Sequence, residues 1–152
     1  MSTRENLCRK LPPTATHEVR DTCLCLYVQR AARALARRFD EVLRPLGLTQ
    51  GQFSLLMSLN RAEPPGIGSV AALLAMDRTT LTANLKPLER RRLVKVAVDK
   101  EDKRGRRLVI SAAGRALLAK AYPVWKKAHA ETERLLTGIS ADAMRDGLRA
   151  LS

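Results

Sequence analysis

The 152-residue sequence contains few aromatic residues and no long apolar run. Its two phenylalanines, two tyrosines and one tryptophan are scattered, which argues against the aromatic stacking surfaces of proteins that bind single-stranded nucleic acids. No apolar run approaches the roughly eighteen residues that a membrane-spanning helix needs. Residues 1–11 are too polar and basic for a secretory signal. We therefore expect a chain that neither crosses a membrane nor is exported.

Histidine and cysteine are also scarce. His17 and His129, the two histidines, have no cysteine or acidic cluster near them in the sequence. The chain also has no metal-ligand spacing, phosphate-binding glycine loop or nucleophile elbow. The sequence therefore predicts no metal, no cofactor and no enzyme activity. Its three cysteines, an odd number, favour reduced thiols in a cytoplasm over a disulfide framework.

Basic residues, by contrast, are in large excess. The chain has 28 lysines and arginines against 15 acidic residues, a formal net charge of +13. A solvated surface can carry such a charge. The other explanation is a polyanionic partner, above all nucleic acid, because each neutralised phosphate releases counterions and adds affinity. Composition alone leaves both interpretations open.

The segment from Gly66 to Gly114 has the pattern of a complete winged helix-turn-helix. Ser69 and Asp77 are suited to cap two short helices that a tight turn separates. An apolar strand, a charged turn and a second strand then form a hairpin, the wing. The expected elements are helices at 70–75 and 78–91 and strands at 93–98 and 108–110, which flank a charged tip at 99–105.

Helical periodicity surrounds this segment. Apolar residues recur every three or four positions before and after it. Thr49 and Ser111 are suited to cap helices, and Pro123 should kink the helix that contains it. The fold class is therefore mainly α with a small antiparallel β-wing. The expected flanking helices span 22–43, 50–60, 112–136 and 140–151.

The helix at 78–91 has the features of a helix that enters the major groove of DNA. Leu81, Leu85 and Leu88 share one face and should pack against the preceding helix. The other face offers short hydrogen-bonding groups and one small residue that permits close approach to bases. In isolation this face fits an ordinary surface helix equally well, and its place between a turn and a wing favours DNA. The candidate contacts on this helix are Arg78, Thr79, Thr80, Thr82, Ala83, Asn84, Lys86 and Arg90.

The wing tip alternates basic and acidic residues. Guanidinium groups fit the narrow, negative minor groove of A·T-rich DNA. Asp99, Glu101 and Asp102 should fold the tip by pairing with basic neighbours, so not every arginine is available to DNA. A plain charged turn is the alternative, and the adjacent helix pair favours DNA contact. The candidate contacts in the wing are Lys103, Arg104 and Arg106.

Several short motifs together resemble the multiple antibiotic resistance regulator (MarR) family. They are Leu46-Gly47-Leu48-Thr49-x-x-Gln52-Phe53, Asp77-Arg78-x-Thr80-Leu81, Leu88-Glu89-Arg90-x-x-Leu93-Val94, Asp99-x-x-Asp102-x-Arg104 and Leu108-x-Ile110-Ser111-x-x-Gly114-Arg115. The match covers about residues 20–150. It implies a homodimeric transcription regulator, usually a repressor, on a pseudo-palindromic site in double-stranded DNA. It also implies that Asp102 braces the wing and that Arg104 enters the minor groove.

A chain of 152 residues is expected to form a single domain, with a flexible arm at 1–19. By the resemblance, its dimerisation helices would lie at about 20–47 and 112–152 and its winged helix-turn-helix at about 49–111. Two other functions stay open: a non-specific architectural nucleic-acid-binding protein, and a thiol peroxidase that acts through Cys23. Strong preference for one duplex would distinguish the regulator from the architectural protein.

The resemblance also suggests a redox signal. Cys23, followed four residues later by Tyr27, is similar to the branch that senses organic hydroperoxides, in which cysteine oxidation releases the DNA. The chemistry requires a thiolate, an access path and a partner thiol. Cys25, two residues further along one helix, would point to nearly the opposite side, which leaves Cys8. A buried cysteine is also a common apolar filler.

A small aromatic ligand is the alternative signal in this family. It would bind between the dimerisation helices and the DNA-binding lobe. The residues that suit such a pocket are equally those that a hydrophobic core contains. The candidate pocket residues are Leu24, Tyr27, Phe53, Met57 and Trp125.

Overall fold

The computed structural model describes residues 11–152, which divide into two compact units at residue 35. The first unit holds α1 (Pro13–Thr22) and the first part of α2 (Leu24–Leu43). The second unit holds the rest of α2 and every later element. Among the described helices, none combines the length and apolar character that crossing a bilayer requires.

The predicted flexible arm is partly helical. It is expected over residues 1–19, of which residues 1–10 lie outside the described part of the chain, and Pro13–Thr22 form α1. A proline at its first turn is favourable, because the N–H that proline lacks has no partner there in any case. The predicted helix at 22–43 is interrupted at Cys23, whose N–H donates to the carbonyl of Val19 at 3.0 Å. α2 therefore starts at Leu24.

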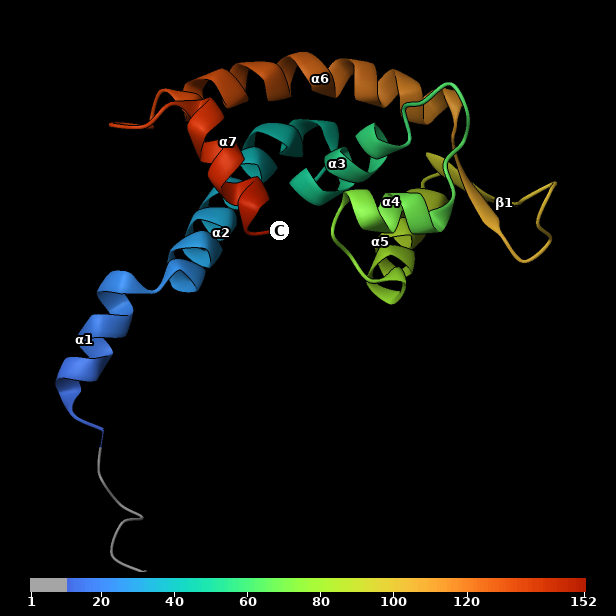
Figure 1. Cartoon of the computed structure of the whole chain (residues 1–152). Coiled ribbons are helices and arrows are strands. Elements are labelled where there is room, and N and C mark those ends of the chain that lie inside the picture. Colours follow the sequence, from blue (N-terminus) through green and yellow to red (C-terminus); the bar gives the residue numbers. More distant parts are fainter. Residues whose placement is uncertain (1–10) are drawn as a thin grey trace, which may run out of the picture. The chain divides into compact units, whose positions relative to one another are not determined.

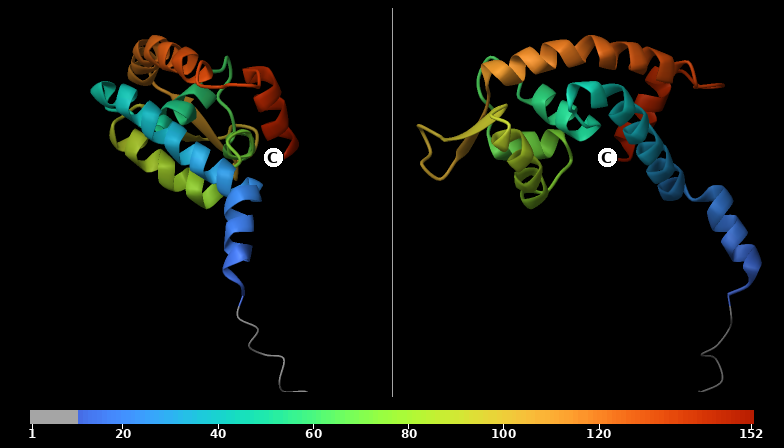
Figure 2. Two further views of the ribbon diagram at one scale, coloured as in Figure 1. Left: turned by 90° about the vertical axis from the view of Figure 1, so that its left-hand side faces the viewer. Right: turned by 180° about the vertical axis from the view of Figure 1, so that it is seen from behind.

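The second unit is a helical body with a two-stranded hairpin. In Figure 1, α6 lies along α3, with α4 and α5 beyond α3, and the rear view in Figure 2 agrees. The hairpin projects near one end of α6, and α7 follows the other end. α6 continues through Pro123 without a break and is drawn as a gentle arc. The elements are η1 (Arg44–Leu46), α3 (Gln50–Ser58), α4 (Ile67–Leu73), α5 (Arg78–Arg90), β1 (Val94–Val98), β2 (Arg106–Ile110), α6 (Ala112–Glu133) and α7 (Ala141–Ala150).

Side-chain caps begin most of these helices as the sequence predicts. Thr49 accepts a hydrogen bond from the N–H of Gln52, and the side chain of Gln52 accepts one from the N–H of Thr49. This reciprocal pair is a capping box, which satisfies two amides that the helix leaves unbonded. Asp77, Ser111 and Ser140 cap α5, α6 and α7.

The start of α4 differs from the prediction. The helix begins at Ile67, three residues before the predicted position, and Gly66 occupies its N-cap. Ser69 is not a cap but lies in the first turn, where its hydroxyl donates to the carbonyl of Gly66 at 3.1 Å. The earlier start buries part of Ile67 against the core.

One hydrophobic core joins α3, α4, α5 and the base of the wing. Most of its members are leucines spaced three or four positions apart on their helices, as the helical period requires. Burial of such side chains is the main source of stability in a domain of this size. The largest fully buried side chains are Leu43, Leu55, Leu56, Leu59, Val70, Leu81, Leu85, Leu88 and Leu108.

The wing is anchored at its base on both sides. β1 and β2 pair antiparallel, with Val94 opposite Ile110 and Val98 opposite Arg106. The loop before α4 adds a third segment, because the N–H of Leu108 donates to the carbonyl of Pro65 at 2.9 Å. The hairpin is therefore fixed to the start of α4, and its orientation relative to α5 is set.

Candidate nucleic-acid interface

Helix α5 buries one face and exposes the other. Leu81, Leu85 and Leu88 are at most 1% exposed, as predicted. All eight side chains predicted to contact DNA on this helix are exposed. Pro87 lies inside α5 without ending it, so one continuous helix extends to Arg90.

Hydrogen bonds within α5 occupy some of its polar groups. Asp77 accepts from the N–H of Thr80 at 2.7 Å and from its hydroxyl at 2.9 Å. These two bonds stabilise the charged carboxylate and hold the pKa of Asp77 below its ordinary value. The hydroxyl of Thr82 donates to the carbonyl of Arg78 at 2.7 Å. Thr80 and Thr82 therefore present oxygen acceptors and methyl groups outward, rather than free donors.

The acids of the wing tip fold the turn. Asp99 accepts from the N–H of Glu101 at 3.0 Å, and Asp102 accepts from the N–H of Arg104 at 2.9 Å. The Glu101 amide, followed by the Arg107 guanidinium, lowers the pKa of Asp99. The sequence predicts acid–base pairing here. The structure shows it for Asp99 with Arg107 at 2.6 Å, whereas Asp102 braces the backbone instead.

The wing arginines have different partners. Nη1 of Arg106 donates to the carbonyls of Gly105 at 3.0 Å and Lys103 at 3.2 Å, so this guanidinium folds under the tip. Arg107 pairs with Asp99 and also donates to the carbonyl of Pro64 at 3.2 Å. Among the bonds of residues 11–152, none involves the side chain of Arg104. Sequence reasoning did not identify Arg107 as a brace, since only the hairpin register places it beside Asp99.

The predicted redox residues lie in the first unit. Cys23 is half-buried between α1 and α2, and Cys25 is exposed on α2. The prediction that Cys25 points away from Cys23 assumed that both residues share one helix; Cys23 instead precedes α2, and both thiols are free. Tyr27 is also exposed, and Cys8 lies outside the described residues.

The predicted pocket residues are divided between the two units. Leu24 and Tyr27 are exposed on the part of α2 in the first unit. Phe53 is buried in the core and stacks on Trp125 with ring centroids 5.9 Å apart. Met57, in contrast, lines an open pocket, so of the three candidates in the second unit it is the one placed beside a cavity.

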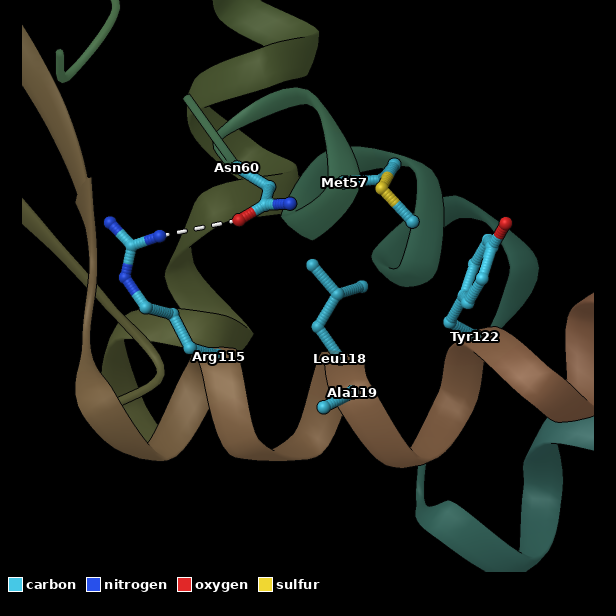
Figure 3. A pocket seen from close by; sticks show the side chains of 6 residues that line it. All are labelled: Met57, Asn60, Arg115, Leu118, Ala119 and Tyr122. Atoms are coloured by element: carbon cyan, nitrogen blue, oxygen red, sulfur yellow. Dashed lines mark hydrogen bonds between the residues drawn. The ribbon is translucent and has the colours of Figure 1, made fainter. Parts of the chain in front are cut away.

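This pocket lies between α3 and the first half of α6 and has a volume of about 320 Å³ (Figure 3). Leu118 and Ala119 form apolar wall beside Met57, and Tyr122 closes one side. At the other end, Arg115 donates to the side-chain oxygen of Asn60 at 3.2 Å. None of these residues except Met57 was predicted, because the pocket brings together two helices far apart in the sequence.

The described residues form no cluster of metal-binding side chains. No group of three or more His, Cys, Asp or Glu side chains within them is arranged to hold a metal ion. His129 instead stacks on Trp125, with ring centroids 4.7 Å apart.

Comparison with known proteins identifies a matching family and similar solved structures. The sequence pattern of the MarR family matches residues 48–105. The crystal structure of the M. tuberculosis transcriptional regulator MosR in complex with DNA has a TM-score of 0.78 and 37% identity, covering 86% of this chain and 93% of that one.

Two curated relatives align over part of their length. The HTH-type transcriptional regulator TtmR of Methylorubrum extorquens is 33% identical over 100 residues, which are 66% of this chain and 51% of TtmR. The HTH-type transcriptional regulator SarZ of Staphylococcus haemolyticus is 28% identical over 92 residues, 60% of this chain and 61% of SarZ. The chain thus spans about half to three fifths of the curated relatives it matches.

Proposed function

Since the chain belongs to the MarR family, we propose that it is a transcription regulator that binds one double-stranded DNA sequence with strong preference. One observation carries this proposal: the exposed polar face of α5 lies beside a basic wing in which Asp99 and Asp102 are bonded to the backbone of the tip. A helix of this kind fits the major groove, and a basic hairpin beside it fits the neighbouring minor groove. Arg104 is the wing side chain that we assign to the minor groove.

We assign the active form to a homodimer on a pseudo-palindromic operator. In the first unit, α2 exposes Leu24 and Leu35, which are 67% and 42% exposed. In the second unit, the end of α6 and α7 expose Leu135, Leu148 and Leu151. Apolar helix faces of this kind are covered when a second copy packs on them. Two recognition helices would then occupy successive major grooves about one helical turn apart.

As in a repressor, the DNA would be released when the spacing of the two α5 helices in the dimer changes. The dimer would exchange between a spacing that fits DNA and one that does not, and a signal shifts this equilibrium only by the difference in its affinity for the two forms. We propose two candidate signals. One is a small aromatic ligand in the apolar pocket beside Met57 and Tyr122, and the other is oxidation of Cys23, which lies at the junction of α1 and α2.

Fluorescence anisotropy tests the binding proposal. The purified protein is titrated with a duplex from the region upstream of its own gene and with a shuffled duplex, both across a salt series. We expect the native duplex to bind at least a thousandfold more tightly than the shuffled one. Equal, steeply salt-dependent binding to both would instead indicate the architectural function that the charge of +13 suggests.

Variants then test the residues. Arg104→Ala should weaken binding while leaving the dimer intact, and Lys120→Ala, which removes an exposed charge from α6, is the matched control. Equal affinities for the Arg104 and Lys120 variants would remove Arg104 from the interface. Cys23→Ser should abolish release by organic hydroperoxide and retain release by aromatic acids if the thiol is the sensor. Steady consumption of hydroperoxide with a thiol reductant would instead reveal a peroxidase.

A further inference from the structure

A cleft of about 440 Å³ lies between the start of α5 and the wing. Arg78 and Thr82 line it from α5, residues 66–68 line it from the start of α4, and the wing tip forms the opposite side. All of these residues belong to the second unit. The cleft is therefore bounded by the two elements that the proposed function assigns to two different grooves of DNA.

Arg78 reaches this cleft because Gly68 has no side chain. A Cβ atom on Gly68 would lie 3.2 Å from Nη2 of Arg78, closer than ordinary van der Waals contact. The guanidinium thus lies against the backbone of α4. Among residues 11–152, no hydrogen bond or ion pair involves this guanidinium, and the neighbouring carboxylate of Asp77 is occupied by Thr80. Its positive charge remains available to a ligand.

The acids that line the cleft do not neutralise it. Asp99 uses one oxygen for the N–H of Glu101 and the other for Arg107. Asp102 accepts the N–H of Arg104. The acids stay ionised, but three guanidinium groups (Arg78, Arg104 and Arg106) line the cleft against two carboxylates, one of which is also paired with Arg107, so the cleft is net positive. A guanidinium without a partner in such a cleft suits a phosphate, which accepts several charge-assisted hydrogen bonds.

The geometry of DNA identifies which phosphate this is. A strand of the duplex backbone separates each major groove from the adjacent minor groove. If α5 enters the major groove and the wing enters the adjacent minor groove, the backbone strand between the two grooves must pass between α5 and the wing. We infer that the cleft binds a backbone phosphate of this strand through Arg78, while Arg104 on the opposite wall extends into the minor groove, and that Gly68 is the positioning residue whose missing side chain leaves Arg78 room to lie there. The inference rests on the proposed function, and it makes Arg78 a backbone contact without sequence preference.

Salt dependence and specificity test this assignment together. A duplex that the wild-type protein selects from a random pool is compared with an unrelated duplex, for wild type and Arg78→Ala, across a potassium chloride series. We expect Arg78→Ala to bind both duplexes about tenfold or more weakly. The ratio between the duplexes should stay constant, and the slope of log affinity against log salt should fall by about 0.9 for each subunit. A loss confined to the selected duplex, with an unchanged slope, would make Arg78 a base contact and overturn the inference.

Gly68→Ala tests the positioning role without removing a charge. We expect it to weaken binding to both duplexes by severalfold, while Gly51→Ala on α3, whose new Cβ comes no closer than 4.0 Å to Oγ1 of Thr49, leaves binding unchanged. Circular dichroism establishes that each variant is folded. Equal binding by the Gly68 and Gly51 variants would refute the role of Gly68.

Neutral methylphosphonates locate the phosphate itself. Each phosphate of the selected duplex is replaced in turn, and the affinities of wild type and Arg78→Ala are compared on every modified duplex. At one position in each half-site the two proteins should bind with equal affinity, because the phosphate that Arg78 contacts has already lost its charge. A full Arg78→Ala loss at every position would overturn the inference while leaving the regulator intact. If wild type bound no duplex at all, the proposed function would fail as well.

Discussion

Gly114 offers a sharp test of how the wing is joined to the helical body. A Cβ atom there would lie 2.4 Å from the carbonyl oxygen of Leu93 and 2.8 Å from Cγ1 of Ile110. That oxygen also accepts the N–H of Ser111 at 2.9 Å, next to the cap of α6. Gly114→Ala therefore forces the start of the wing away from the start of α6 and weakens this hydrogen bond.

The size of the effect follows from opposing contributions. Overpacking of this kind costs about 1–3 kcal/mol, and the weakened hydrogen bond adds about 1 kcal/mol. Alanine is more favourable than glycine in a helix by about 1 kcal/mol, which offsets part of the cost. The net loss is about 1–3 kcal/mol, and the melting temperature should fall by about 3–10 °C for a chain of this length.

Thermal unfolding at one fixed protein concentration measures this loss, because association would otherwise change the melting temperature. Gly51→Ala is the matched control, since Gly51 also lies in the first turn of a helix and its new Cβ would come no closer than 4.0 Å to Oγ1 of Thr49. It should raise the melting temperature by about 1–3 °C. If Gly114→Ala were as stable as Gly51→Ala, the close approach of Leu93 would impose no constraint and the reasoning would be wrong.

Three further substitutions have defined outcomes. Leu85→Ala empties a position that is 1% exposed and should lower the free energy of unfolding by about 2–5 kcal/mol in urea titration, whereas a loss below about 1 kcal/mol would contradict its core position. Asp77→Ala should destabilise α5, and Asp77→Asn should do so less. Hydrogen bonds from Thr80 lower the pKa of Asp77 in the folded protein. The difference in the free energy of unfolding between wild type and Asp77→Ala should therefore be full above the ordinary pKa of 3.8 and shrink as the pH falls below it. Arg107→Ala should loosen the wing, seen as faster hydrogen exchange at the amide of Glu101, and unchanged exchange would show that Asp99 needs no partner.

The sequence predicts the winged helix-turn-helix well because its signals are local. Caps at Thr49, Asp77 and Ser111 are short side chains followed by helical periodicity, and the buried leucines of α5 repeat at helical spacing. The misplaced start of α4 shows the limit of local reasoning. Both Gly66 and Ser69 are acceptable N-caps, and packing of Ile67 against the core decides between them.

Other features depend on contacts between distant residues. The bond from Arg107 to Pro64 and the pocket between α3 and α6 join segments that no local pattern relates. The break at Cys23 is also unexpected, because the apolar repeat of α2 continues across neighbouring positions. Burial at these sites comes from tertiary packing, which overrides the weak preference of each residue.

Acidic and basic residues have different roles in this fold, and these roles connect the fold to the proposed function. A net charge of +13 would by itself support non-specific attraction to any polyanion. Sequence preference requires instead that cations be held at fixed positions beside a face that reads bases. Asp77, Asp99 and Asp102 achieve this by bonding to the backbone of α5 and of the wing tip. These bonds leave the acids ionised, but they fix the backbone beside Arg78 and Arg104, and no carboxylate among the described residues pairs with either guanidinium. The same acids that fold the proposed interface therefore hold its cations in place.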